Sequence, residues 1–452
     1  MRVHVVDPSA FTPPYDHALC RALAAAGAEV ELFTSRFAYG AVPAPEGYER
    51  HELFYRLAHR GAAMGKRSRS SQALKLLEHV PDMLRYRHAA RAADVVHFQW
   101  LTVQPLDVHL LPRRRPMDSR ARPPGPRLVL TAHDVLPREP RPGQLAAQRR
   151  LYERFDAVVV HSEHGRRRLL ELGVDPARVH VIPHGALTHL ATPGAFTHLA
   201  APSTAPTMGG QAERRVGMLD GPPPSAAARP VVLFFGLLRP YKGLDVLLRA
   251  WREIEGAELW IVGMPRMDLR ALDAAHGGVL GRSCTEAGRH SLRSHPRFGQ
   301  HTSLPASLPC LAQNPHGAYG KETSGPIRLV PHFIPDAELP AYFARADLVV
   351  LPYLEADQSG VLFTALAFGK PLLLSDVGGF PEVAATGAAR TFAAGDSGAL
   401  HNALGALLAD PAALSQLTER ARAAAAGPYS WREVAQRTLE LYDELLDEDR
   451  QA

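Results

Sequence analysis

The chain has 452 residues, of which 46% are hydrophobic and 21% charged, so it can bury substantial cores and is too long for one ordinary domain. Its formal net charge of +5 neither requires nor excludes a nucleic-acid partner. Residues 1–187 hold 28 basic and 19 acidic side chains, whereas the remainder holds 23 and 27. The composition therefore predicts two domains, the first of them basic.

Cysteine usage and hydropathy indicate the compartment. Three cysteines spread over the chain make neither a disulfide framework nor a metal-ligand pattern, which fits a reducing environment. The first residues lack the basic and apolar regions of a signal peptide. No run approaches 18 apolar residues, since even 348–354 ends at Glu355, so no membrane span is predicted. We expect a cytoplasmic protein, at most peripheral at the inner face of the membrane.

The first half alternates short apolar runs with alanine- and leucine-rich helical stretches, the pattern of parallel βαβ units. A strand over 3–7, a helix over 15–26 that stops at Gly27, and a strand over 29–33 form the first unit. A helix is predicted over 166–172. Further buried strands are predicted over 94–98, 127–132, 157–161 and 179–183. The first domain is expected to span 1–187.

The pattern then stops twice. Residues 188–229, rich in Pro, Gly, Ala, Ser and Thr, are interpreted as a flexible linker or insert. A second α/β domain is predicted over 230–430, interrupted by a loop insertion at 277–326, and a final helix covers 431–452. The strands of this domain are predicted over 231–236, 258–262, 327–330, 348–352 and 371–375, and its helices over 244–254, 337–346 and 360–369.

Two segments of the second domain carry candidate binding chemistry. Within 233–248, a strand leads through Gly236 to Arg239, Lys242 and a helix start. Two cations at the carboxyl end of a strand, beside a glycine that lets backbone approach, suit a diphosphate. Ordinary solvated charges in a loop are the alternative.

The second segment, 347–371, runs from a buried strand through a polar turn into an apolar helix ended by Gly369. Gln358, Ser359 and the amides of Gly360 and Val361 would stand at the helix N-terminus, where free N–H groups and the helix dipole favour an anion. Alternatively, Ser359 is only a helix cap. A cap explains the serine but not the cations expected at the same sheet edge.

Together with residues 375–382 and the helix over 431–445, these segments closely resemble the retaining family-4 glycosyltransferases of the GT-B fold. Residues 94–100, 130–134, 156–162 and 179–185 are similar to blocks of that family in the family's order. The resemblance implies an α/β fold of two Rossmann-like doubly wound domains that face each other across a cleft. The first would take the acceptor and the second the nucleotide sugar, with the C-terminal helix crossing back toward the first.

The resemblance also implies site residues. Arg239 and Lys242 match the family's diphosphate-binding cations, and His133 matches a histidine over the sugar near the reacting carbon. Pro14, Tyr15 and Asp134 fall in loops that approach donor and acceptor, although relatives often carry glycines where Pro13 and Pro14 stand. The donor-binding positions are Gly236, Gly263, Gln358, Ser359, Gly360, Val361 and Thr364, with His332 and Phe333 at the nucleotide base.

One departure bears on activity. Many members carry two glutamates eight residues apart, where this chain has Ala356 and Thr364; it resembles the subset with a Gln-Ser-Gly turn in place of that paired-glutamate motif. The implied function is a retaining hexosyltransferase of polysaccharide biosynthesis. The alternative is a catalytically degenerate relative that binds a nucleotide sugar or glycan and assists an active transferase.

The implied substrates are a UDP-, GDP- or ADP-sugar and a glycan, lipid-linked or small-molecule acceptor, with no cofactor, no metal and no nucleic-acid partner. The spacing of His161 and His164 is a coincidence to be expected among 22 histidines, so no metal site is predicted there. The first domain's basic side chains are usually a solvated face, but they also suggest contact with an anionic membrane. They include Arg56, Arg60, Lys66, Arg67, Arg69, Arg113 to Arg115 and Arg166 to Arg168.

Overall fold

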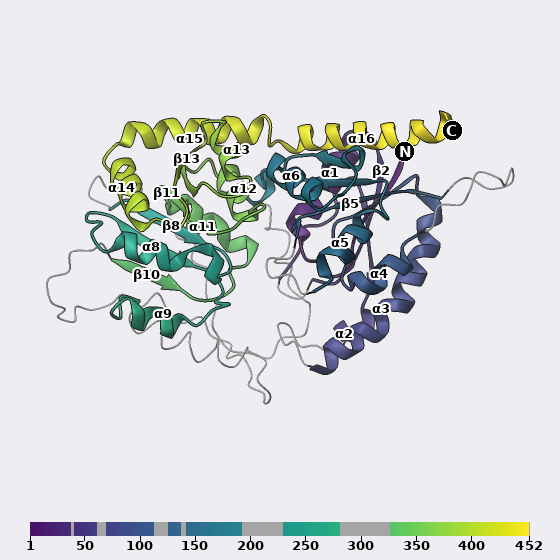
Figure 1. Cartoon of the computed structure of the whole chain (residues 1–452), viewed down its shortest axis with the longest axis horizontal. Helices are drawn as coiled ribbons and strands as arrows, with labels where there is room; N and C mark the ends of the chain where they lie inside the picture. The colour runs from purple at the N-terminus through teal and green to yellow at the C-terminus, as the bar shows by residue number, and fades with distance from the viewer. Residues whose placement is uncertain are drawn as a thin grey trace, which may run out of the picture.

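A computed structural model describes residues 1–37, 40–60, 69–112, 125–136, 142–191, 229–280 and 326–451. Two parallel sheets lie side by side, and helices α15 (Pro411–Ala426) and α16 (Trp431–Gln451) run along one edge of the pair (Figure 1). The predicted α/β fold with two Rossmann-like domains is confirmed.

The N-terminal sheet has the order β3-β2-β1-β4-β5-β6-β7. Its strands are β1 (Arg2–Asp7), β2 (Glu29–Ser35), β3 (Glu49–Phe54), β4 (Val95–Phe98), β5 (Arg127–Thr131), β6 (Ala157–Val160) and β7 (Val179–Val181). Its helices are α1 (Pro13–Ala25), α2 (Arg56–Arg60), α3 (Arg69–Ala89), α4 (Gln104–Leu110), α5 (Gln144–Tyr152) and α6 (Glu163–Glu171). Most strands are buried on both faces, as expected of parallel strands covered by helices.

The C-terminal sheet has the order β10-β9-β8-β11-β12-β13. Its strands are β8 (Val231–Phe235), β9 (Glu258–Val262), β10 (Ile327–Val330), β11 (Leu348–Leu351), β12 (Leu372–Ser375) and β13 (Ala389–Phe392). Its helices include α8 (Leu244–Trp251), α9 (Leu269–Ala275), α11 (Leu339–Arg345), α12 (Gly360–Ala367), α13 (Phe380–Ala384) and α14 (Ser397–Leu408). The predicted strands of both sheets are present to within two residues at either end.

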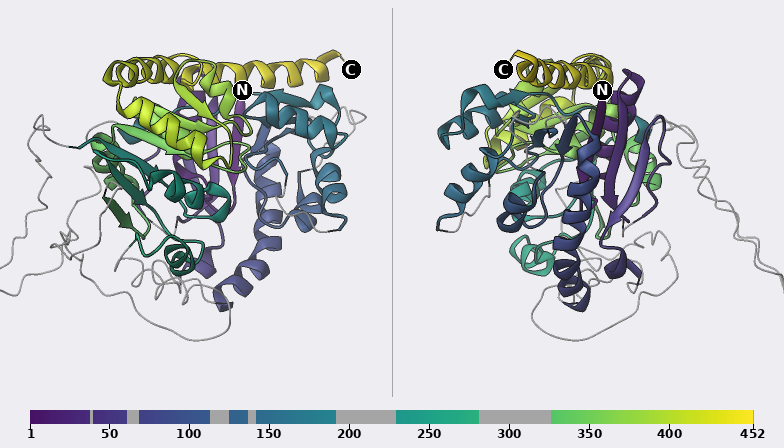
Figure 2. Two further views of the ribbon diagram at one scale, coloured as in Figure 1. Left: turned by 60° about the vertical axis from the view of Figure 1, so that its left-hand side comes forward. Right: turned by 90° about the vertical axis from the view of Figure 1, so that its right-hand side faces the viewer.

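The last helix joins the two halves. Val434 and Tyr442 on α16 are fully buried in the same apolar cluster as Val3 and Val5 of β1, and the Tyr442 hydroxyl lies 2.6 Å from Nδ1 of His97. These contacts place α16 beside α1 against one face of the N-terminal sheet, and Figure 2 shows the helix running along that domain. The chain therefore returns to its first domain after completing the second.

The first residues of the predicted linker, 188–191, are helical, contrary to the expected flexible segment. Thr188–Ala191 forms the short helix α7, and Leu187 and Leu190 are buried in a core of the C-terminal domain. The helix forms there because Leu187 and Leu190 pack into that apolar core. Residues 192–228 lie outside the described part of the chain, as do 281–325 of the predicted insertion. Among the described helices, none is long and apolar enough to cross a membrane.

Candidate functional site

The site lies where each sheet changes winding direction. In the first sheet the switch falls between β1 and β4, and in the second between β8 and β11; loops after such strands form the crevice that ligands occupy in open α/β sheets. Hydrogen bonds bring the two edges together. The amide of Val135, after β5, donates to Asp357 Oδ2 after β11 at 3.0 Å, so the carboxyl ends of the sheets face each other.

On the C-terminal side, three predicted donor-binding residues converge after β8. A methyl group at Gly236 would lie 3.0 Å from Lys242 Nζ and 3.0 Å from Val361 Cγ2. Gly263 is packed against them, since a Cβ there would lie 1.8 Å from the Gly236 carbonyl oxygen. Only glycine fits either position, because both also have φ above +100°.

The two predicted cations differ in exposure. Lys242 is 8% exposed, and its Nζ lies 4.8 Å from the centroid of the Tyr353 ring, a geometry in which the ring face attracts the ammonium. Arg239 is exposed and stands at the N-cap of a short 3₁₀ turn over Pro240–Lys242. The Lys242 side chain is therefore fixed by its burial, whereas the Arg239 side chain is exposed to solvent.

The polar turn supplies the start of α12. Ser359 occupies the N-cap position but makes no side-chain cap bond; its hydroxyl lies 3.3 Å from that of Tyr353. The amides of Gly360 and Val361 belong to the first turn, whose N–H groups have no intrahelical acceptor. Thr364 Oγ1 donates to the Gly360 carbonyl at 2.8 Å, so its hydroxyl is engaged within the helix.

On the N-terminal side, His133 lies in a cluster of aromatic rings. Its ring stacks on Trp100 with centroids 5.0 Å apart and meets Tyr15 edge-on at 4.7 Å. Its Nδ1 is 3.2 Å from His161 Nε2, and its Nε2 is 3.1 Å from the Gln99 side chain. Burial lowers the pKa of His133 well below its ordinary value and that of His161 to about 4, so both rings are neutral at pH 7.

The hydrogen bonds fix the tautomers of this chain of rings. His161 Nδ1 lies 3.0 Å from the Ile182 carbonyl, which can only accept, so the proton of the neutral ring sits on Nδ1. His161 Nε2 then accepts from His133 Nδ1–H. The His133 Nε2 is left with a lone pair, yet the Gln99 atom placed 3.1 Å from it is Oε1, while Gln99 Nε2 is buried with no hydrogen-bond partner among the described residues. Exchanging the oxygen and nitrogen of this amide lets its NH₂ group donate to His133 Nε2 and satisfies both groups.

The histidine cluster touches the polar turn of the other domain. Gln358 Nε2 donates to the His161 carbonyl at 3.3 Å, and the His184 ring stacks on Phe363 of α12 with centroids 4.3 Å apart. The structure therefore brings His133, the 358–361 turn, Gly236 and Lys242 into one continuous region.

The expectation that Pro14 and Tyr15 occupy a loop is wrong. Both belong to the first turn of α1, with Pro13 and Pro14 at its first two positions, where the fixed φ of proline suits a helix and its missing N–H costs nothing. Tyr15 is 4% exposed and its ring meets Trp431 of α16 at 5.1 Å. Asp134 is exposed beside His133.

The predicted base-binding residues follow β10, on the outer strand of the second sheet. The His332 side chain is exposed and the Phe333 side chain half-buried. The amide of Gly263 donates to the Val330 carbonyl at 2.9 Å, as does that of His332 at 3.1 Å. His332 therefore lies at the same sheet edge as Gly263.

Sequence reasoning missed the residues that join the domains. Asp357 accepts from Arg168 Nη1 at 2.7 Å, and Glu382 accepts from the amides of Glu163 and His164 at 2.9 Å each, at the N-terminus of α6. Arg168 was expected on a solvated basic face and instead crosses to the other domain. The sequence shows that Asp357 and Glu382 stand in loop motifs, but it does not show what they bind, because their partners in α6 are about 190 to 220 residues away.

A pair of parallel-sheet domains with facing carboxyl edges and a C-terminal helix that returns to the first domain is the GT-B fold of glycosyltransferases. Residues 14–185 match the model of the glycosyl transferase 4-like domain, and residues 318–410 match that of glycosyl transferases group 1. Each of the two domains is therefore similar, over part of its length, to a domain of glycosyltransferases.

Individual proteins resemble the chain over most of its length. The D-inositol 3-phosphate glycosyltransferase of Kineococcus radiotolerans is 28% identical, with 94% of this chain and 88% of that protein aligned. Among solved structures, the sucrose-phosphate synthase of Thermosynechococcus elongatus has a TM-score of 0.62 at 19% identity, covering 99% of both chains. HepE of Anabaena, solved with UDP and glucose, has a TM-score of 0.60 at 17% identity, covering 98% of this chain and 100% of its own.

Proposed function

We propose that the chain transfers a sugar from a nucleotide-sugar donor to an acceptor with retention of anomeric configuration, and that its Gln-Ser-Gly turn replaces the paired-glutamate motif. The observation that carries the proposal is the meeting of Lys242, Gly236 and the first turn of α12 at the switch point of the second sheet. A buried cation and free helix amides provide what a diphosphate needs.

In the proposed reaction, the bond between the anomeric carbon and the diphosphate oxygen breaks while the acceptor oxygen attacks from the same face. Arg239 and Lys242 stabilise the negative charge that develops on the departing diphosphate. The acceptor's proton passes to an oxygen of that diphosphate, so no protein nucleophile and no metal ion take part. His133, neutral and fixed by His161, lies over the sugar.

The proteins that resemble this chain suggest which nucleotide base and which acceptor to test first. UDP is the first nucleotide to test because the HepE structures hold UDP, UDP-glucose or UDP with glucose. A small phosphorylated acceptor is favoured among the acceptor classes, since several relatives are named D-inositol 3-phosphate glycosyltransferases. The basic balance of the first domain fits an anionic acceptor, whether free or at a membrane surface.

The residues at positions 356 and 364 favour a second candidate function, donor binding without transfer. Position 356 is an alanine, and the hydroxyl of Thr364, at the position of the second glutamate, is donated to the Gly360 carbonyl. A degenerate relative would bind a nucleotide sugar without transferring it.

Thermal unfolding with UDP, GDP and ADP tests the donor site. One base class should raise the melting temperature, because a ligand at 100 times its Kd adds about 2.7 kcal/mol. Lys242→Met should abolish that shift and lower transfer by roughly 10²–10³-fold, whereas Arg252→Met, on an exposed side chain, should retain both. A Lys242→Met protein with near-normal nucleotide shift and turnover would overturn the assignment.

A further inference from the structure

A second cluster of ligand-type side chains lies in the N-terminal sheet, away from the donor site. Register pairs His4 of β1 with Glu31 of β2, and Glu31 with Glu49 of β3, so these three side chains share one face in one row. His51, two residues beyond Glu49, is on the same face. The row crosses three adjacent strands at the edge of the sheet.

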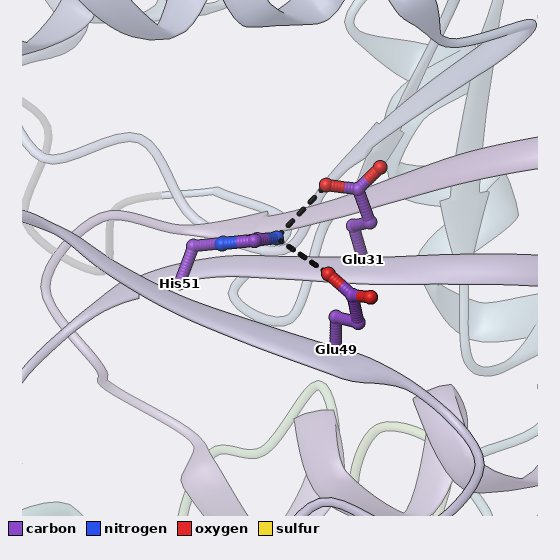
Figure 3. Close-up of side chains that lie close together, drawn as sticks. All are labelled: Glu31, Glu49 and His51. Atoms are coloured by element: carbon purple, nitrogen blue, oxygen red, sulfur yellow. Dashed lines mark ion pairs between the residues drawn. The ribbon is translucent and has the colours of Figure 1, made fainter.

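The ligand atoms converge. His51 Nε2 lies 2.8 Å from Glu31 Oε2 and 3.6 Å from Glu49 Oε2, and the three groups lie within 4.8 Å of one another (Figure 3). Zinc–nitrogen and zinc–oxygen bonds of about 2.0–2.2 Å in a tetrahedral arrangement place neighbouring ligand atoms roughly 3.4 Å apart. The two measured distances bracket that spacing.

Among the described residues, both histidines lie close to Glu31 as ion pairs, but neither makes a hydrogen bond to it. His51 Nε2 is buried and has no hydrogen-bond partner there, despite its short distance to Glu31. His4 is 1% exposed, and neither of its ring nitrogens has a partner, although Nε2 points toward Glu31 Oε1 at 3.5 Å. Buried polar groups are nearly always paired, so this second observation also points to an absent ligand.

The surroundings suit a divalent transition metal. Phe33 orients both rings, stacking on His51 at 4.7 Å and lying 4.6 Å from His4. The nearby cation Arg2 is paired with Glu29 at 2.8 Å, and two carboxylates balance a +2 ion. Imidazole with carboxylates favours zinc over calcium or magnesium, which take oxygen ligands.

We propose that Glu31, Glu49 and His51 bind a Zn²⁺ ion that stabilises the sheet, with a water molecule as the fourth ligand on the exposed side of Glu49, and that His4 holds the second oxygen of Glu31. Outer groups of this kind orient metal ligands. The ion would fasten the edge strand β3 to the sheet, close to Tyr86 near the end of α3, whose ring centroid lies 6.2 Å from that of His4. It lies outside the donor site and takes no part in the proposed transfer.

Zinc binding to the full chain, untagged and stripped with chelator, tests the proposal by competition with a chromogenic chelator. We expect one Zn²⁺ per chain, a rise in melting temperature on loading, and no such rise with Ca²⁺ or Mg²⁺. His51→Ala should weaken binding by more than the roughly 10–100-fold that loss of an outer-shell partner costs. The control His88→Ala removes an exposed histidine elsewhere and should bind as the unmodified chain does.

Glu49→Gln answers the question if His51→Ala fails to fold, because the Glu49 side chain is 78% exposed and its loss should leave the fold intact. Reduced zinc affinity in this variant supports the site. Substoichiometric zinc in the unmodified chain, or unchanged zinc affinity in Glu49→Gln and His51→Ala, would mean adventitious binding only and an ordinary ion-pair network. The nucleotide-dependent melting shift should be the same with and without zinc, which separates this result from the test of the donor site.

Discussion

The most constrained side chains of the site are histidines whose protons are fixed by the backbone. The Ile182 carbonyl sets the tautomer of His161, and His161 in turn sets that of His133. Because burial depresses the pKa of both rings, neither gains a proton between pH 6 and 8. His161 thus acts as a positioning residue for His133.

His161→Gln should lower kcat by up to about 100-fold, the cost of misplacing a group at a reacting centre. The Kd of the nucleotide should stay constant, since His161 belongs to the other domain. Steady-state kinetics and nucleotide titration measure the two quantities. The unmodified chain should show no kinetic pKa near 6.5 from these rings, and an acidic limb there that disappears in His133→Gln would contradict the tautomer assignment.

Among the elements, the β1–α1 connection depends on a buried pair of carboxyl groups. Asp7 accepts from the amides of Ser9, Phe11 and Thr12 at 3.2, 2.6 and 3.1 Å, which shapes the loop at the switch point. Asp16 of α1 is 1% exposed beside it. Burial raises the pKa of Asp16 well above its usual value, and the neighbouring Asp7 adds to that rise, so we expect the pair to share a proton.

As the pH rises, the Asp16→Asn variant should lose less stability than the unmodified chain. A carboxyl group whose pKa is raised by folding contributes stability that is present at low pH and lost as pH rises through the folded-state pKa. The loss is about 1.4 kcal/mol for each pH unit that separates the folded and unfolded pKa values. The amide of asparagine removes this loss and still donates to Asp7. Urea unfolding between pH 5 and 8 measures it, and parallel stability curves for the two proteins would exclude the shared proton.

The elements also show what can be predicted from the sequence. Strands such as β8 and β11 are continuous apolar runs, and their predicted bounds agree with the structure within one residue. Strand β3 escapes prediction because its residues Glu49–Phe54 are mostly polar, as an edge strand allows. The glycines and cations of the site follow from local motifs. The approach of Gly236 to Val361 and the row from His4 to Glu49 depend on strand order and register instead.

Across the whole molecule, two carboxylates add polar bridges between the domains. Asp357 bridges to Val135 and Arg168, and Glu382 caps α6 across the interface. These contacts lie at the edge where donor and acceptor would meet. Closure of this kind excludes water that would otherwise hydrolyse the donor.

Asp357→Asn should loosen this closure. We expect a larger radius of gyration by small-angle scattering and a higher ratio of donor hydrolysis to transfer, because the asparagine loses the charge that pairs with Arg168. Glu163→Gln changes an exposed carboxylate of the same interface region without touching Asp357 and serves as the control. Unchanged hydrolysis and scattering in Asp357→Asn would show that closure does not depend on this bridge.

The proposed function requires that the chain transfers sugar and does not only bind the donor. Release of free nucleotide from a panel of UDP-, GDP- and ADP-sugars tests it most directly, with and without inositol phosphate, glycan or lipid-linked acceptors. We expect slow release from donors of one base class and faster release when the correct acceptor is added. Donor binding without nucleotide release under any of these conditions would contradict it and identify the degenerate binding protein instead.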